Sequence, residues 1–160
     1  MERRKNEKRL GRRKHYALAD RQRDHPASED LDGKCAEKHF LGKTLEEAES
    51  LFREASIVYQ EDLMFMGPIA FRFYLQAAIS YVQSDASTGD PDIISCFAMI
   101  LEHRFKFEAK ELPPVAPELA LVCRYILEHY DRFSLTPEIY GDLRPRFQAL
   151  EQAFLRQIQT

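Results

Sequence analysis

The segment of residues 68–83 constrains the fold of this chain more than any other. On an α-helix its polar side chains form one narrow stripe, made of Arg72, Gln76, Ser80 and Gln83. Every other direction is apolar, and the proline at position 68 suits a first turn, where its missing N–H loses no hydrogen bond. A helix with so little polar surface is stable when other helices surround it, so we predict that this segment is the central helix.

Helical spacing of apolar residues predicts four further main helices. The first starts at Thr44, where Glu47 completes a capping box, and runs to about Tyr59. The other three each start near a proline, at Pro91, Pro117 and Pro137. Pro145 divides the last segment into a short turn and a longer final helix. Because no segment alternates like a convincing strand, the predicted fold class is all-α, a compact bundle of about five helices.

The same spacing predicts which side of each helix is buried. The first helix buries Ala48, Leu51, Phe52, Ala55 and either Val58 or Tyr59. The helix after Pro91 buries Ile93, Ile94, Phe97, Ile100 and Leu101, and the next one Leu119, Val122, Cys123, Ile126, Leu127 and Tyr130. The last helix buries Phe147, Leu150, Phe154 and Ile158. Cys96 and Cys123 lie on or beside apolar faces, where a thiol acts as a small hydrophobic group.

Charge divides the chain into two unequal parts. Residues 1–24 hold ten Lys and Arg against four acids, whereas residues 25–160 hold thirteen basic and twenty-two acidic side chains. Few apolar residues occur in the basic part, so we expect residues 1–34 to be a disordered or loosely helical arm with a linker, and residues 35–160 to be one helical domain.

The basic arm can contact a polyanion through six side chains, Arg3, Arg4, Lys5, Arg12, Arg13 and Lys14. No aromatic residues are interleaved with them to stack on bases, and no nucleic-acid-binding motif follows. An arm that is solvated, or that lies on the acidic domain, is therefore favoured over binding to nucleic acid.

No motif of a catalytic, metal or cofactor site stands out. Gly42-Lys43-Thr44 matches the end of a phosphate-binding loop but lacks the upstream glycine and the preceding strand. Ile-Leu-Glu-His occurs at residues 100–103 and again at 126–129, yet neighbouring helix residues point about 100° apart, which does not suit shared metal ligation. Cys35 and His39 share a helical face but offer too few ligands for structural zinc. We therefore expect no metal and no cofactor.

Arg72 and Gln76 lie one turn apart on the polar stripe of the predicted central helix. They can anchor a buried polar network, line a cleft with Tyr74, or mark the side that faces water. The structural interpretations are favoured. An enzyme of unknown reaction, with a pocket near Arg72 and Gln76 that His103 or Tyr74 also lines, is the alternative.

Two stretches, Phe40-Leu41-Gly42-Lys43-Thr44 and residues 67–77, resemble a family of small bacterial proteins of unknown function. Members carry a Gly-Lys/His-Thr/Asp helix start and an Ala-Phe-x-Tyr/Phe-Tyr-Leu-Pro-Ala stretch. The resemblance covers residues 35–83, with Gln76 where the family has proline and Lys38 where a Cys-x-x-Cys would have its second cysteine. It implies a small helical bacterial protein and supplies no catalytic residues. By analogy of class, such acidic proteins resemble immunity or accessory proteins near toxin genes.

The sequence therefore predicts a non-catalytic helical protein-interaction module of the bacterial cytoplasm. Its acidic domain favours another protein as partner, one with a basic surface, because opposite charges attract over several ångströms. A toxin-neutralising or accessory role is one version of this hypothesis. No apolar run approaches the roughly 20 residues of a membrane span, so we expect no membrane partner.

Overall fold

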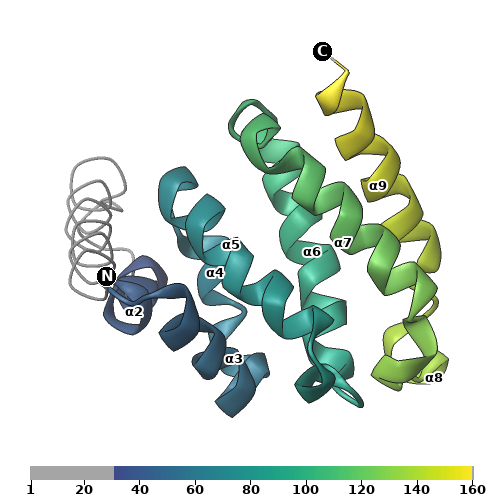
Figure 1. Cartoon of the computed structure of the whole chain (residues 1–160), viewed down its shortest axis with the longest axis horizontal. Coiled ribbons are helices and arrows are strands. Elements are labelled where there is room, and N and C mark those ends of the chain that lie inside the picture. Colours follow the sequence, from purple (N-terminus) through teal and green to yellow (C-terminus); the bar gives the residue numbers. More distant parts are fainter. Residues whose placement is uncertain (1–30, 160) are drawn as a thin grey trace, which may run out of the picture.

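Figure 1 shows the computed structural model of this chain, which describes residues 31–159. These residues form helices and loops without a strand, so the fold is all-α. The α-helices, labelled as in Figure 1, are α2 (Leu31–Phe40), α3 (Leu45–Tyr59), α4 (Asp62–Phe65), α5 (Pro68–Gln83), α6 (Pro91–Glu108), α7 (Ala116–Glu128), α8 (Pro137–Tyr140) and α9 (Arg144–Ile158). Short 3-10 turns lie between them: η1 (Asp85–Ser87), η2 (Ala109–Glu111), η3 (Pro113–Val115) and η4 (Tyr130–Phe133).

The described residues hold eight α-helices, where the sequence predicts about five. The five long ones, α3, α5, α6, α7 and α9, match the predicted segments, and α8 is the predicted short turn. The sequence pattern misses α2 and α4. Helix α2 crosses the predicted boundary at residue 35, and it has few apolar residues of its own. Tertiary contacts hold it instead, since Ala36 and Phe40 are buried and the Tyr74 hydroxyl donates to the Phe40 carbonyl. The basic residues of the predicted arm lie outside the described residues.

Helix α3 starts as the sequence predicts. The Thr44 hydroxyl accepts a hydrogen bond from the Glu47 N–H at 3.2 Å, and the Glu47 carboxylate accepts one from the Thr44 N–H at 2.7 Å, which completes the capping box. At Ala55 the backbone leaves helical geometry, with φ −157° and ψ 78°. After this kink, Tyr59 is half-buried and Val58 is exposed. Of the two predicted alternatives, Val58 is therefore the wrong one.

Helix α5 is the enclosed helix that its polar stripe predicts. Half of its residues are buried: Ala70, Phe71, Tyr74, Leu75, Ala77, Ala78, Tyr81 and Val82. Arg72 is half-buried, and the other three stripe residues are exposed. Helix α5 packs mainly against α3 on one side and against α4, α6 and α7 on others, as Figure 1 shows near the middle of the molecule. Burial of this segment within the core is confirmed.

The predicted buried faces of α6 and α7 are also confirmed, with Leu127 only half-buried. In α9, Phe147, Leu150 and Phe154 are buried, but Ile158 is exposed because it lies at the last residue of the helix. The prediction for Ile158 is therefore wrong. None of the helices from α2 to α9 is long and apolar enough to cross a membrane.

Helices α5, α6, α7 and α9 alternate in direction. Phe71 in the first turn of α5 contacts Arg104 near the end of α6, so these two helices run in opposite directions. The Gln157 amide near the end of α9 donates to the Ala109 carbonyl directly after α6 at 2.8 Å, so α6 and α9 end on the same side of the molecule. The loop after α5 and the loop after α7 consequently meet at the same end of the molecule. The Gly89 N–H donates to the Arg132 carbonyl at 2.8 Å and joins the two loops directly.

Two arginines bind main-chain carbonyl groups where helices end. Arg104 is 1% exposed and donates to the carbonyls of residues 63, 64 and 66, after and within α4. Arg132 donates to the Val82 carbonyl at 3.1 Å, to the Ser84 carbonyl and to the Ser87 hydroxyl, at the end of α5. Guanidinium groups suit this position because the last carbonyls of a helix have no intrahelical donor.

Candidate functional site

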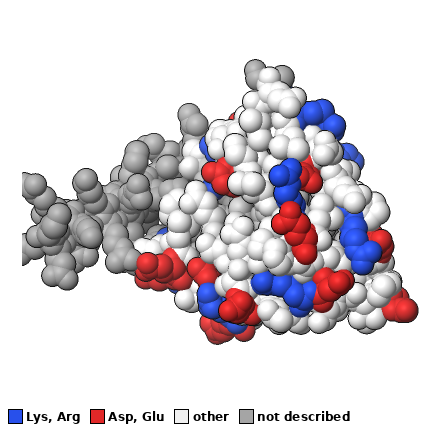
Figure 2. Space-filling view, turned by 45° about the vertical axis from the view of Figure 1, so that its right-hand side comes forward, with Lys and Arg blue, Asp and Glu red and all other residues white. Residues whose placement is uncertain are grey.

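The two loops that meet at one end of the molecule bring six acidic residues together. We call residues 84–92 and 129–144 the acidic end, which lies near α8 in Figure 1. Its acids are Asp85, Asp90, Asp92, Asp131, Glu138 and Asp142, and its only lysines or arginines are Arg132 and Arg144. Four of the six acids are exposed, whereas Asp90 and Asp92 are half-buried. Figure 2 shows red and blue side chains interspersed along the lower edge, in the centre and on the right of the face in view.

Asp90, one of the two half-buried acids of the acidic end, stabilises the fold. Asp90 caps α6 by accepting from the Ile93 N–H at 3.3 Å, as the sequence predicts. Its other carboxylate oxygen accepts from the Ser56 hydroxyl at 2.5 Å and from the Tyr81 hydroxyl at 2.8 Å. Burial, and then the hydrogen bond to Asp90, raise the pKa of Tyr81. One carboxylate thus joins α3, α5 and α6, and it is not available to a ligand.

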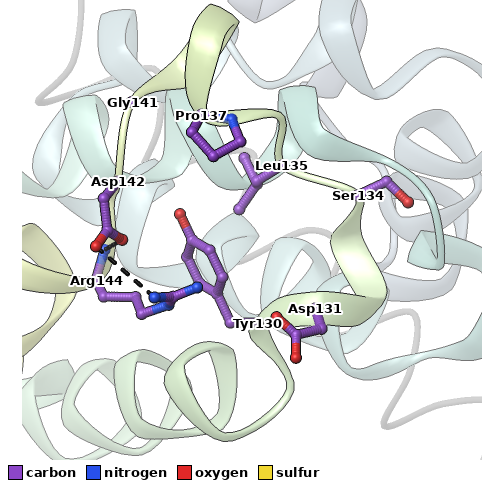
Figure 3. A pocket seen from close by; sticks show the side chains of 8 residues that line it. All are labelled: Tyr130, Asp131, Ser134, Leu135, Pro137, Gly141, Asp142 and Arg144. Carbon is purple, nitrogen blue, oxygen red and sulfur yellow. Dashed lines mark hydrogen bonds and ion pairs between the residues drawn. The ribbon is translucent and has the colours of Figure 1, made fainter.

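A cavity of about 220 Å³ opens at the acidic end (Figure 3). Its lining is Tyr130, Asp131, Ser134, Leu135, Pro137, Gly141, Asp142 and Arg144. The chain bends around it at two positions with positive φ, Ser134 with φ 56° and Gly141 with φ 69°. Ser134 is the one non-glycine residue between 31 and 159 with positive φ, a conformation that L-residues seldom adopt. The cavity is therefore shaped by a defined loop geometry.

Tyr130 and Arg144 form one side of this cavity. The Arg144 guanidinium carbon lies 4.6 Å from the centre of the Tyr130 ring, and the Tyr130 hydroxyl accepts from the Leu143 N–H at 3.0 Å. Arg144 Nη1 is 3.8 Å from Asp142 Oδ2, and their side chains are 52% and 54% exposed. Solvent screens a pair of this kind, so it contributes little stability.

Asp131 lies across the cavity from Asp142 (Figure 3) and has no ion-pair partner among the described residues. Leu135, Pro137 and the Tyr130 ring supply apolar surface. The eight lining residues include no histidine or cysteine. Two carboxylates beside an aromatic and aliphatic wall suit a ligand with a positively charged group at the end of an apolar chain.

The structure does not bring Arg72, Gln76 and Tyr74 to one surface. Arg72 Nη1 donates to the Glu111 carboxylate at 2.8 Å and to the Glu111 carbonyl at 3.0 Å, outside the core, and Gln76 is exposed. Tyr74 is buried on another side of α5, where its hydroxyl donates to the Phe40 carbonyl and lies 3.3 Å from that of Lys43. Arg72 and Tyr74 therefore hold loops to α5.

The histidines and acids singled out in the sequence also have structural contacts. His39 Nδ1 lies 2.7 Å from Asp62 Oδ2, so the His39 side chain joins α2 to α4. Asp62 is buried, and desolvation raises the pKa of its carboxyl group although His39 opposes the change. Glu102 binds Arg146 of α9 at 2.6 and 2.7 Å, and His103 is exposed beside Phe107.

The cysteines are free thiols in three different environments. Cys35 is exposed, Cys96 is half-buried and Cys123 is buried, which confirms the positions predicted for the last two. Burial raises the pKa of the Cys123 thiol to about 12. In the part of the chain that the structure describes, no three His, Cys, Asp or Glu side chains are grouped so that they can hold a metal ion.

Sequence reasoning missed the cavity, Arg104 and Arg132. The prolines at positions 137 and 145 mark the helix starts beside the cavity, but no local pattern shows that the loops before them meet the loop after α5. No protein-family model, curated protein or solved structure matches this chain. The resemblance of residues 35–83 to a small bacterial family therefore stays a prediction, and the class that the fold defines is an all-α protein with an acidic end.

Proposed function

We propose that this protein is a non-catalytic interaction module whose partner is a protein with a basic surface, docked on the acidic end. The observation that carries the proposal is the negative charge of this end, which contains six acids and two arginines. Arg132 is occupied by main-chain carbonyls and by the Ser87 hydroxyl, and Arg144 is stacked on Tyr130. Asp85, Asp131, Glu138 and Asp142 are exposed and give the surface its negative sign.

Charge of one sign on one end acts mainly on the encounter between proteins. It raises the association rate with an oppositely charged surface and orients the approach, and salt weakens both effects. Ile139 on α8 is 74% exposed within the same end, and burial of such a side chain supplies part of the binding energy that surface charges lack. A toxin-neutralising or accessory protein of the bacterial cytoplasm is one version of this function.

A photo-crosslinking experiment in cells of the native host tests the proposal. A benzophenone amino acid replaces Ile139 in the full chain, and in a matched control it replaces exposed Lys110, beyond the far end of α6. Helix α6 has 18 residues and is about 27 Å long. Its first turn is joined to the acidic end by the hydrogen bond from the Tyr140 hydroxyl to Asp92, whereas Lys110 follows its last turn. We expect a discrete crosslinked protein of basic surface from position 139 and none from position 110.

Charge variants then identify the surface. The double substitution Asp85→Asn with Glu138→Gln should reduce the crosslink from position 139, because both carboxylates are exposed at the acidic end. Glu54→Gln with Glu118→Gln removes the same charge from exposed sites on α3 and α7 and should leave it unchanged. Equal crosslinking from both positions, or equal loss in both double variants, contradicts docking on the acidic end.

A further inference from the structure

We infer that the cavity of Figure 3 receives one basic side chain of the partner, an arginine or a lysine, with its cation between Asp131 and Asp142. The inference rests on the proposed function and names what the acidic end recognises. It follows from the size of the cavity, from its wall, and from the charges at its rim.

The size of the cavity fits a single side chain. Its volume of about 220 Å³ is below the roughly 300 to 1,000 Å³ of pockets that hold drug-sized ligands and cofactors. The wall formed by Tyr130, Leu135 and Pro137 can cover the methylene groups of an arginine or lysine side chain. An aromatic face beside the entering group also attracts a cation through its quadrupole.

The two carboxylates at the rim of the cavity, Asp131 and Asp142, have free positions for accepting hydrogen bonds. Asp131 has no ion pair with any residue from 31 to 159, and Asp142 has only the long contact of 3.8 Å to Arg144 besides its hydrogen bond with the Arg144 N–H at 3.1 Å. Figure 3 shows these two carboxylates on opposite sides of the Arg144 guanidinium. An ionised carboxylate can accept several hydrogen bonds at once, so a second cation finds free acceptor positions here.

Arg144 acts as a resident cation in this arrangement. Its guanidinium covers the Tyr130 ring at 4.6 Å and lies nearest to Asp142, the same two groups that an incoming arginine uses. Because its side chain is half-exposed and weakly paired, it can move aside at small cost. Removal of the Arg144 charge should therefore strengthen binding of a basic side chain, whereas loss of either carboxylate should weaken it.

An anion on Arg144 is the opposite possibility. A carboxylate or phosphate placed there has Asp131 and Asp142 on either side, and like charges at this distance repel. The charge of the rim, two carboxylates against one guanidinium, favours the cation.

The test uses the full chain and small probes, so that it does not depend on finding the partner. Nα-acetyl-arginine amide is titrated while backbone amide resonances are followed by NMR, and Nα-acetyl-citrulline amide, of nearly the same shape without the charge, serves as the matched probe. We expect the arginine probe to shift the amide signals of residues 130–144 and the citrulline probe to leave them in place. Asp131→Asn and Asp142→Asn should each lower the affinity for the arginine probe by about threefold, and Arg144→Gln should raise this affinity by a similar factor.

Asp85→Asn is the control, since it removes an exposed carboxylate of the acidic end outside the cavity. The inference is overturned if both probes bind equally well, or if Asp85→Asn and Asp131→Asn change the affinity for the arginine probe equally. It is also overturned if sodium acetate, and not the arginine probe, shifts the amide signals of residues 130–144. If a protein is crosslinked at position 139 and Asp131→Asn and Asp142→Asn do not change the crosslinking yield, the inference is contradicted but the proposed function is not. Arginine binding in the cavity without any crosslinked protein contradicts the proposed function alone.

Discussion

Arg104 donates from Nη2 to the main-chain carbonyl of Leu63 at 2.7 Å, although Arg104 is 1% exposed. The same guanidinium binds the carbonyls of Met64 and Met66, forms an ion pair with Glu108, and lies 4.4 Å from the centre of the Phe71 ring. Helix α4 has only four residues, and a helix of that length is not stable by itself. One buried side chain of α6 therefore holds α4 and the start of α5 in place.

Replacement of Arg104 by methionine should lower the free energy of unfolding by about 3 kcal/mol. Methionine has a comparable length, but it leaves the carbonyls at the end of α4 without a donor inside the protein. Urea unfolding followed by far-ultraviolet circular dichroism measures the change. Lys106→Met, on the exposed side of the same helix, is the control and should change stability by less than about 0.5 kcal/mol. A similar small effect for Arg104→Met would show that the carbonyls do not need this donor.

Gln60 offers a substitution that should stabilise the protein. Its side chain is fully buried between the end of α3 and α4, and neither amide atom has a hydrogen-bond partner in the described structure. Burial of an amide without partners costs free energy, so Gln60→Met should raise the free energy of unfolding by about 1 kcal/mol. Gln76→Met, on the exposed stripe of α5, is the matched control and should have little effect. A loss of stability in Gln60→Met contradicts the prediction and indicates that the amide is hydrogen-bonded in solution.

Two threonines with similar sequence signals should respond differently to alanine. Thr44 makes the capping-box hydrogen bonds at the start of α3, whereas Thr136 precedes α8 without a side-chain capping bond. We expect Thr44→Ala to cost about 1 kcal/mol of stability and Thr136→Ala less than about 0.5 kcal/mol, both measured by urea unfolding. Equal losses would show that the cap geometry does not decide the effect.

Local patterns predict the five long helices, because helix caps and the spacing of apolar residues involve residues only three or four positions apart. The capping box of Thr44 and the enclosed character of α5 are both visible in the order of the residues. The kink at Ala55 is not visible there, since nothing in its neighbours departs from helical spacing, and Val58, which follows the kink, is exposed. Helix α2 is missed for a related reason, because contacts with distant residues such as Tyr74 hold it.

The acidic end could not be predicted from local patterns, because it combines two loops, residues 84–92 and 129–144, that are distant along the chain. Asp90 is recognisable as a helix cap, but its contacts with Ser56 and Tyr81 join residues as far as 34 positions apart. Arg144 and Asp142 are neighbours in the sequence and look like ordinary surface charges. Their place beside Tyr130 follows from the antiparallel packing of α7 and α9, which no local signal specifies.

The thiol of Cys123 should make stability depend on alkaline pH. Desolvation, and then the charge of Glu151, raise its pKa from 9.0 to about 12 in the folded protein. Between these values the unfolded chain loses the thiol proton while the folded protein keeps it, so the unfolded state binds fewer protons and stability falls as pH rises. The contribution is fully present below pH 9 and is lost toward pH 12, with a slope of at most about 1.4 kcal/mol per pH unit.

Urea unfolding at several pH values from 9 upward measures this slope. Cys123→Ala lacks the titrating group, so its stability should fall less steeply with pH than that of the unchanged protein, whatever its stability at pH 7. Cys35→Ala removes an exposed thiol and should keep the original slope. If Cys123→Ala and Cys35→Ala lose stability equally steeply, burial of Cys123 does not control its proton, and the packing of α7 against α9 around this residue is looser than the structure describes.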